Sequence, residues 1–207
     1  MDIFVVDISG VEFSSLERYL DCVSAGRRKA VLDKKQEESR IQSLVGGLLL
    51  RSEISRRTGA PMKKIVFDKG AHGKPYIKGG GIQFSLSHTK GAVCAAFADD
   101  EGEIGVDIER RDRRASEALK RKTLSENEKA LVTSDAAFVR IWVKKEAFLK
   151  RTGIGIATKL NGADTTLIPD VAAFECGEYF VGASGKGAEQ ANIVVVPLSE
   201  LLSRFDV

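Results

Sequence analysis

The chain has 207 residues, of which 43% are hydrophobic and 29% are charged, a balance that suits one large domain or two small ones with a sizeable core. Lysine and arginine total 32 against 29 acidic residues, and the resulting formal charge of +3 is too small to indicate nucleic-acid binding. The three cysteines lie far apart, which excludes a disulfide framework and a CxxC zinc pair, and two histidines are too few for a multi-histidine zinc site.

The expected compartment follows from cysteine usage and from targeting signals. The first ten residues lack the basic and long apolar regions of a signal peptide. No stretch approaches the roughly 18 apolar residues that a membrane span needs. An odd number of scattered cysteines is typical of a reducing compartment. We therefore expect a soluble, cytoplasmic protein with no membrane partner.

Hydrophobic periodicity predicts one long helix among short strands in the first half of the chain. The helix spans residues 34–57 and ends at Gly59 and Pro61, and its apolar residues recur at i, i+3, i+4 and i+7. This predicted buried stripe consists of Ile41, Leu44, Val45 and Leu48. The predicted strands are residues 3–8, 65–67, 84–87 and 92–98.

The second half of the chain has the same mixture of elements. A strand at 104–109 precedes two predicted helices, at 116–132 and 136–151. Further strands are predicted at residues 166–168, 172–175, 179–181 and 193–196. Helices and short strands in both halves predict an α+β fold. We divide it into an N-terminal half, residues 1–101, and a C-terminal half, residues 102–207.

Two carboxylates stand together on the strand at residues 104–109. Asp107 and Glu109 are two positions apart, so both side chains point to one face, while Val106 and Ile108 point to the other. Neighbouring carboxylates repel each other unless a cation lies between them, and carboxylate oxygens are the ligands that a hard divalent ion prefers. The alternative is a solvent-facing strand with two ordinary acids that nearby arginines neutralise. This motif alone favours that alternative.

The helix at residues 136–151 places further charges beside apolar residues. Its apolar stripe consists of Phe138, Ile141, Trp142, Phe148 and Leu149. Its predicted water-facing residues are Arg140, Lys144 and Ala147. Glu146 projects among apolar neighbours, where an unpaired charge is costly and demands a partner. A metal shared with the strand carboxylates would supply one, and so would Lys145 or Lys150; the alternatives are a surface ion pair and a snorkelling lysine.

Groups suited to phosphate binding occur in the first half. Ser87 and His88 end a predicted strand, and because adjacent strand residues face opposite ways, they make a poor nucleophile–base pair. They could hold a phosphate instead, as could Lys74, which lies on a loop between Gly73 and Pro75. From these segments alone, a surface histidine and an ordinary turn explain the residues equally well. The chain contains no GxxxxGK[ST], GxGxxG, GxSxG or HExxH motif.

In combination, these motifs resemble those of the Sfp-type 4′-phosphopantetheinyl transferases. The hallmark of that family is a Gly-x-Asp-x-Glu strand followed by a helix with Trp-x-x-Lys-Glu-x-x-x-Lys, and residues 105–109 and 142–150 match it. The family's upstream motifs match residues 73–75 and 84–88. The four motifs occur in order, cover roughly residues 27–155, and are highly specific in combination.

The resemblance implies an α+β fold of two similar halves related by a pseudo-twofold axis, with coenzyme A in the cleft between them. It implies that Asp107, Glu109 and Glu146 bind Mg²⁺ together with the pyrophosphate of coenzyme A. The positions that match phosphate-binding residues of the family are Lys74, Ser87, His88, Lys150 and, within a basic segment, Arg28.

Three further positions are compared with the family's pattern. Gln42 stands where the family often has an arginine, which affects the expected phosphate contacts of the first half but not the metal site. Thr89 follows the histidine where a serine is more usual, a mild change. Glu128 matches a commonly acidic position, and the sequence assigns it no role.

The implied function is transfer of 4′-phosphopantetheine from coenzyme A to a serine of an apo acyl or peptidyl carrier protein, with release of adenosine 3′,5′-bisphosphate. Glu146 would be the general base, Lys150 would stabilise the leaving group, and Asp107 would hold Mg²⁺. Two similar lobes within one chain favour a monomer. The alternatives are a non-catalytic module that binds coenzyme A or a carrier protein, and a metal-dependent phosphohydrolase that would release phosphate without a carrier.

Overall fold

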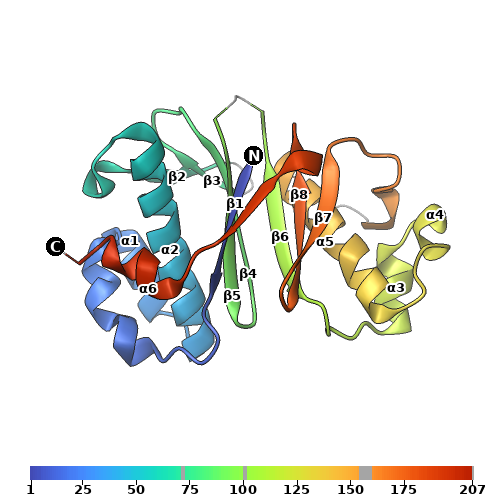
Figure 1. Cartoon of the computed structure of the whole chain (residues 1–207), viewed down its shortest axis with the longest axis horizontal. Helices are drawn as coiled ribbons and strands as arrows, with labels where there is room; N and C mark the ends of the chain where they lie inside the picture. Colours follow the sequence, from blue (N-terminus) through green and yellow to red (C-terminus); the bar gives the residue numbers. More distant parts are fainter. Residues whose placement is uncertain (71–72, 100–101, 154–159, 207) are drawn as a thin grey trace.

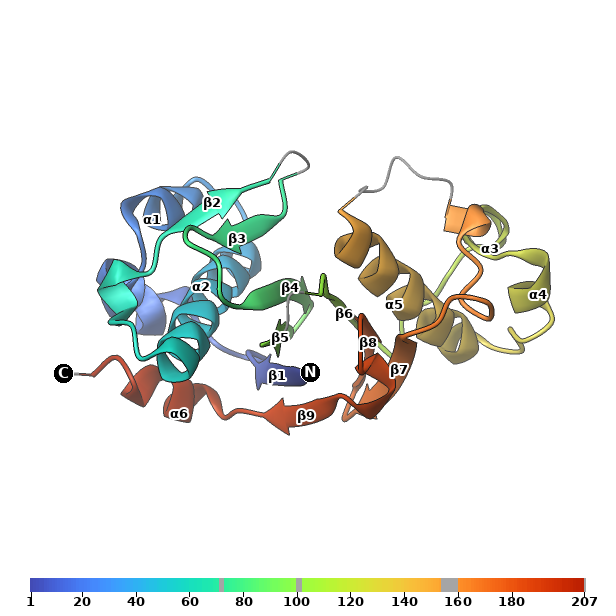
Figure 2. The same ribbon diagram turned by 90° about the horizontal axis from the view of Figure 1, so that it is seen from above.

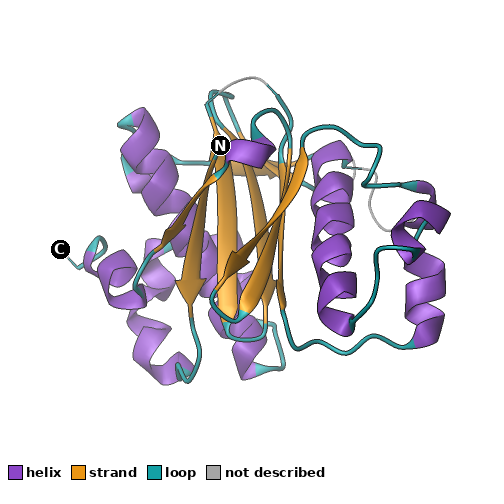
Figure 3. Ribbon diagram, turned by 45° about the vertical axis from the view of Figure 1, so that its right-hand side comes forward, coloured by secondary structure: helices purple, strands orange, loops and turns teal. Residues whose placement is uncertain are grey.

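The computed structural model describes residues 1–70, 73–99, 102–153 and 160–206. They fold into two lobes, each with a β-sheet and one long helix: α2 (Glu37–Thr58) in the first lobe and α5 (Asp135–Thr152) in the second (Figure 1). The two sheets face each other between these helices, so the layers run helix, sheet, sheet, helix (Figure 2, Figure 3). The predicted α+β fold is confirmed. Among the described helices, none is both long and apolar enough to cross a bilayer.

The sheet of the first lobe has four strands in the order β4-β5-β1-β9. These are β1 (Asp2–Asp7), β4 (Gln83–Thr89), β5 (Ala92–Ala98) and β9 (Asn192–Val195). Neighbouring strands are antiparallel except β1 and β9, which are parallel. The other elements of this lobe include the 3-10 helices Phe13–Cys22 and Met62–Lys64, α1 (Ala25–Leu32), and a hairpin of β2 (Phe67–Lys69) and β3 (Pro75–Ile77).

The sheet of the second lobe has three antiparallel strands in the order β6-β8-β7. These are β6 (Gly105–Arg110), β7 (Val171–Cys176) and β8 (Tyr179–Ser184). Two short helices, α3 (Glu117–Thr123) and α4 (Glu126–Lys129), precede α5. The chain then returns to the first lobe, where β9 joins the sheet and α6 (Leu198–Ser203) packs against α2 (Figure 2). The sequence did not indicate this return.

Side-chain alternation in the strands explains the layers. The residues of β5 in the core beneath α2 are Val93, Ala95 and Phe97. Those in the core between the two sheets are Ala92, Cys94, Ala96 and Ala98. Because both faces are covered, β5 is apolar throughout. Val106 and Ile108 of β6 enter the core between the sheets, so Asp107 and Glu109 point to the opposite face, which α5 covers.

Two glycines allow α5 to lie very close to the second sheet. A Cβ at Gly105 of β6 would collide with the carbonyl oxygen of Ala147, and a Cβ at Gly182 of β8 would collide with that of Val143. The prediction that Ala147 faces water is therefore wrong: the residue is fully buried, because α5 rests its backbone on the sheet there. This close approach brings Glu146 and Lys150 of α5 near Asp107 of β6.

Most predicted elements are confirmed, with a few differences. The apolar stripe of the helix predicted at 34–57 is buried in α2. The helix predicted at 116–132 is divided into α3 and α4, because Ser125 and Glu128 form a capping box that begins a new helix. The strand predicted at 166–168 is wrong, since the chain forms a turn there. Elements that the sequence did not indicate include the 3-10 helices Phe13–Cys22 and Met62–Lys64, α1 and α6.

Candidate active site

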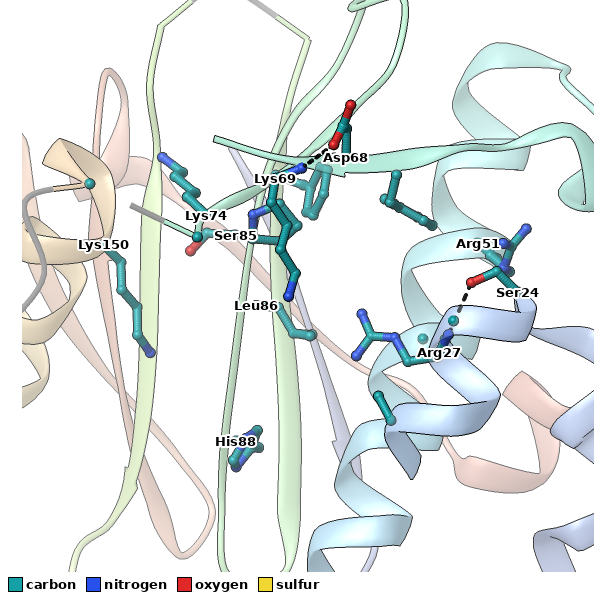
Figure 4. Close-up of a pocket in the computed structure, with 18 of the residues that line it drawn as sticks. Ser24, Arg27, Arg51, Asp68, Lys69, Lys74, Ser85, Leu86, His88 and Lys150 are labelled. Atoms are coloured by element: carbon teal, nitrogen blue, oxygen red, sulfur yellow. Dashed lines mark hydrogen bonds between the residues drawn. The ribbon is translucent and has the colours of Figure 1, made fainter. Parts of the chain in front are cut away.

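A pocket of about 760 Å³ opens between the two lobes (Figure 4). The first lobe contributes α1, α2, the β2–β3 hairpin and β4, and the second contributes the C-terminal half of α5. Lys150 and Arg27 point into it from opposite sides (Figure 4). Such a volume, between two units, is typical of a small-molecule site. The charged and titratable residues of its lining are Arg27, Arg51, Asp68, Lys69, Lys74, His88, Glu146 and Lys150.

Alternate residues of β4 connect the first sheet to β6, a strand of the other sheet. Their hydroxyl groups lie on one face because strand side chains alternate. The three hydrogen bonds join Ser85 Oγ to Val106 N (3.0 Å), Ser87 Oγ to Asp107 Oδ1 (2.8 Å) and Thr89 Oγ1 to Glu109 Oε1 (2.5 Å). Ser87, a predicted phosphate contact, is therefore buried and donates to the carboxylate of Asp107, and it is not part of the pocket lining.

Lys150 connects the β6 carboxylate to the pocket. Its Nζ donates to Ser87 Oγ at 2.6 Å and to Asp107 Oδ1 at 2.7 Å. The Lys150 side chain is 32% exposed and that of Asp107 is 10% exposed, so the lysine reaches the pocket and the aspartate lies behind it. A charge-assisted contact of this kind holds the ammonium group in place. The pocket wall thus presents a fixed cation at the position predicted to contact a phosphate.

Glu146 is a half-buried carboxylate that lines the same wall. Within the described part of the chain, it makes no hydrogen bond or ion pair. Burial, followed by the negative charge of Asp107, raises the pKa of Glu146 above its ordinary value of 4.5, against the opposing charges of Lys150 and Arg113. The sequence predicted that Glu146 needs a partner, and among the described residues Lys150 and Arg113 act on it through their charges, without a hydrogen bond or ion pair. A carboxylate in this state is suited to accept a proton or a cation.

Glu109, in contrast, has partners at both oxygens. Its Oε1 accepts hydrogen bonds from Thr89 Oγ1 and from the backbone N of Arg110 at 2.9 Å. Its Oε2 accepts an ion-paired hydrogen bond from Arg113. The guanidinium of Arg113 also lies over the ring of Trp142, 4.5 Å from its centroid. Glu109 is therefore linked to α5 through an arginine that the sequence treated only as a nearby counter-charge.

The three predicted metal ligands do not form one cluster. Asp107 and Glu146 affect each other electrostatically, while Glu109 is held by Arg113 and Thr89. Of the residues whose positions are described, no group of three or more His, Cys, Asp or Glu has a geometry that could hold an ion. Asp107 and Glu146 still fit a divalent cation, because a positive charge between two neighbouring carboxylates removes their repulsion. The assignment of all three residues as ligands stays a prediction.

Two other predicted phosphate contacts lie in the pocket lining. The Nζ of Lys74 donates to the carbonyl oxygens of Ile104 (3.0 Å) and Arg151 (3.2 Å), so it joins the hairpin of the first lobe to the second lobe. Burial lowers the pKa of Lys74. His88 is exposed on the concave wall, where partial desolvation and the charge of Lys150 lower its pKa. Both residues line the pocket, and their contact with a phosphate stays a prediction.

The basic segment before α2 contributes a different arginine from the predicted one. Arg28 is exposed and pairs with Asp21, and it is not part of the lining. Arg27 lines the pocket, and its stem occupies the space beside Gly47 that a side chain there would fill. Desolvation lowers the pKa of Arg27. The structure therefore favours Arg27 over Arg28 as the pocket residue of this segment. Arg51 of α2, which the sequence did not single out, also lines the pocket.

Gln42 and Glu128 have structural contacts that explain their burial. Gln42 Nε2 donates to the carbonyl oxygen of Thr89 at 2.9 Å, which ties α2 to the end of β4 outside the pocket. Glu128 is completely buried and forms an ion pair with the completely buried Lys145 at 2.6 Å. Its two oxygens also accept hydrogen bonds from Ser125 and Thr165. The partner of Lys145 is therefore Glu128 and not Glu146.

Comparison with known proteins gives consistent similarities over most of the chain. Residues 103–180 match a model described as the 4′-phosphopantetheinyl transferase superfamily, and residues 12–99 match one described as 4′-phosphopantetheinyl transferase, N-terminal. The chain is 35% identical over 141 residues to the 4′-phosphopantetheinyl transferase AcpT of Salmonella typhimurium, covering 64% of this chain and 69% of AcpT.

Two other relatives extend the comparison. The chain is 29% identical over 160 residues to the 4′-phosphopantetheinyl transferase Sfp of Bacillus subtilis, covering 74% of this chain and 70% of Sfp. It is 27% identical over 157 residues to the L-aminoadipate-semialdehyde dehydrogenase-phosphopantetheinyl transferase of Xenopus laevis, covering 67% of this chain and 51% of that protein.

Proposed function

Because the chain belongs to the 4′-phosphopantetheinyl transferase superfamily, we propose that it transfers 4′-phosphopantetheine from coenzyme A to a serine of an acyl or peptidyl carrier protein, with the help of Mg²⁺. The single observation that best supports this proposal is the charge arrangement on one pocket wall. Among the described residues, Glu146 has no hydrogen-bond partner there, and it lies beside an ammonium group that Asp107 and Ser87 hold in place.

The pocket suits coenzyme A because most of the charged residues in its lining are cationic. Arginine and lysine side chains are distributed from one lobe to the other, and two carboxylates accompany them among the described lining residues. The cationic residues are Arg27, Arg51, Lys69, Lys74 and Lys150, and the carboxylates are Asp68 and Glu146. A ligand with phosphates at separate points along its length would meet a cation at each. Arg27 and Lys150 would contact opposite ends of such an anion, since they enter the pocket from opposite sides (Figure 4).

In the proposed reaction, the serine oxygen of the carrier forms a bond to the β-phosphorus of coenzyme A, and the bond from that phosphorus to the bridging oxygen breaks. Adenosine 3′,5′-bisphosphate leaves. Glu146 accepts the serine proton, for which its raised pKa makes it a better base than an exposed carboxylate. Lys150 stabilises negative charge on the phosphates.

Asp107 and Glu146 would hold the divalent cation, with Glu109 as a third ligand. When bound, the cation would supply positive charge to the pyrophosphate oxygens and stabilise the leaving group. Ser87 orients Asp107 by donating to its Oδ1 at 2.8 Å. We further propose that the protein is cytoplasmic and acts as a monomer, because the two lobes of one chain form the pocket.

The test is to incubate the full chain with coenzyme A, Mg²⁺ and apo carrier proteins from fatty-acid, polyketide and peptide synthesis, and to measure intact carrier mass. We expect at least one carrier to gain one phosphopantetheine group, and a carrier with its acceptor serine replaced by alanine to gain nothing. Omission of Mg²⁺ with added chelator should stop the reaction. Binding of coenzyme A without any mass gain would support a binding module instead, and phosphate release without a carrier would support a hydrolase.

A further inference from the structure

Arg113 lies in the turn after β6 and contacts two motifs at once. Its backbone N bonds to the carbonyl oxygen of Arg110, which fixes the turn. Its side chain pairs with Glu109 of the β6 motif and lies over Trp142 of the α5 motif. The side chains of Arg113 and Glu109 are 31% and 17% exposed, so the pair is only partly screened by water.

Both carboxylate oxygens of Glu109 have partners, and Oε2 becomes available to a cation only if Arg113 moves away. Thr89 Oγ1 and the N of Arg110 both bond to Oε1, one from the neighbouring lobe and one from the backbone. Oε2 is bound by Arg113 alone among the described residues. Because the Oε1 partners are short or part of the main chain, the long arginine side chain is the partner that can leave at least cost. Oε2 is therefore the oxygen that a cation would take.

We propose that Arg113 is a cation-sensitive latch: it holds Glu109 through Oε2 in the cation-free protein and releases that oxygen when a divalent cation binds. Arg113 is thus a positioning residue for Glu109, and it lowers the affinity for the cation by competing with it. This inference rests on the metal site of the proposed function. An ordinary surface ion pair is the alternative, in which Arg113 would have no link to cation binding.

Trp142 makes the latch observable, because it is the single tryptophan of the chain. Its indole lies against the Arg113 guanidinium and near the ring of Phe138, at a centroid distance of 6.1 Å. Release of Glu109 removes the ion-pair partner that keeps the guanidinium over the indole. The emission spectrum of Trp142 should therefore report the state of Arg113 without any measurement of turnover.

The first experiment titrates the full chain with Mn²⁺, with and without coenzyme A, and measures free Mn²⁺ by electron paramagnetic resonance against a coenzyme A blank. We expect Arg113→Gln to bind Mn²⁺ about fivefold more tightly than the unmodified chain, since the competing ion pair is lost. Arg113→Lys, which keeps the charge but not the planar fork, should give a smaller change. Asp107→Asn should abolish binding.

Arg114→Gln is the matched control for charge. Arg114 is exposed, and in the described part of the chain it makes no contact with Glu109. The Arg114→Gln variant loses the same positive charge one residue further along the chain. Any gain in cation affinity that comes only from the change in net charge therefore appears in this variant too. Equal gains in Arg113→Gln and Arg114→Gln would overturn the latch and leave the metal site intact. If the unmodified chain binds no Mn²⁺ with or without coenzyme A, both the latch and the metal part of the proposed function fail.

The second experiment follows Trp142 emission while Mg²⁺ is added in place of the paramagnetic ion. We expect the spectrum of the unmodified chain to shift toward that of Arg113→Gln, and the spectrum of Arg113→Gln itself to stay constant. Circular dichroism of each variant confirms that it is folded, as expected for a partly exposed side chain. A chain that binds Mn²⁺ tightly but shows no Mg²⁺-dependent change in emission would also overturn the latch.

Discussion

Lys145 and Glu146 are adjacent on α5, yet their charged groups lie in opposite environments. Lys145 is completely buried, pairs with Glu128 and also donates to the carbonyl oxygens of Leu160 and Ala163. Glu146 faces the pocket and has no hydrogen bond within the described residues. Side chains at consecutive helix positions diverge by about 100°, so one helix can supply both environments.

The pKa directions of the two acids make the same contrast. Burial alone would raise the pKa of Glu128, but hydrogen bonds from Lys145, Ser125 and Thr165 lower it. Burial and Asp107 raise the pKa of Glu146, and no hydrogen-bond donor among the described residues opposes them. A buried charge with all its partners serves the scaffold, whereas one that lacks them is available to a ligand. The following predictions test that distinction.

The largest effect is expected when Glu146 becomes neutral. Glu146→Gln keeps the shape of the side chain but removes the proposed base, so kcat should fall by about 10²–10⁴-fold while the affinity for coenzyme A changes little. Carrier-modification kinetics and direct binding of coenzyme A measure the two quantities separately. Glu126→Gln is the control, because it neutralises an exposed acid of the same lobe that, within the described residues, pairs with Lys129 alone. A normal kcat for Glu146→Gln would exclude its role as the base.

The next effect is on stability. Lys145→Met leaves the buried carboxylate of Glu128 without its counter-charge, and the free energy of unfolding should fall by about 3–5 kcal/mol. Chemical denaturation measures this value. In Lys129→Met, which breaks an exposed pair on α4, the loss should be at most about 1 kcal/mol.

A double variant sharpens this prediction. In Glu128→Leu with Lys145→Met, both charges are gone, so much of the lost stability should return. If the double variant is no more stable than Lys145→Met alone, the unpaired charge of Glu128 is not the main cost. The loss then comes from packing, from the carbonyl contacts of Lys145, or from the Ser125 and Thr165 donors that Glu128→Leu leaves unpaired.

The sequence was most informative where one physical pattern dominated. The uniformly apolar run of β5 predicted the strand to the residue, because burial on both faces requires such a run. Period-2 alternation placed Asp107 and Glu109 on one face of β6, and the helical wheel identified Glu146 as a charge in need of a partner. These inferences depend only on local geometry, which the sequence determines directly.

Contacts between distant segments were beyond these patterns. The sequence offered Lys145 as a partner for Glu146, but Lys145 pairs instead with Glu128, which is on another helix. The position of Arg113 between Glu109 and Trp142 depends on a turn and on how closely α5 approaches β6. Gly105 permits that approach. The sequence showed Gly105 as part of the Gly-x-Asp-x-Glu motif, but the reason that a glycine is needed there, close packing against α5, is visible only in the structure. Local periodicity also could not show which arginine of the basic segment, Arg27 or Arg28, faces the pocket.

The smallest expected effect is a pH-dependent gain in stability for Glu146→Gln. Because the pKa of Glu146 is raised in the folded protein, its ionised form destabilises the cation-free fold, and this penalty is complete only above the raised pKa. Below the ordinary value of 4.5, both folded and unfolded states are protonated and the penalty vanishes. The variant should therefore unfold at a higher denaturant concentration than the unmodified chain at pH 7, and at nearly the same concentration at pH 4.

The matched control and the cation decide what this gain means. Glu17→Gln, at an exposed acid of the first lobe, should show no comparable difference between pH 7 and pH 4. Saturating Mg²⁺ with coenzyme A should remove the advantage of Glu146→Gln at pH 7, because the ligand then stabilises the charged form of the unmodified chain. If the variant is instead less stable at pH 7 without ligand, Glu146 already has a compensating partner in solution, and the contrast with Lys145 disappears.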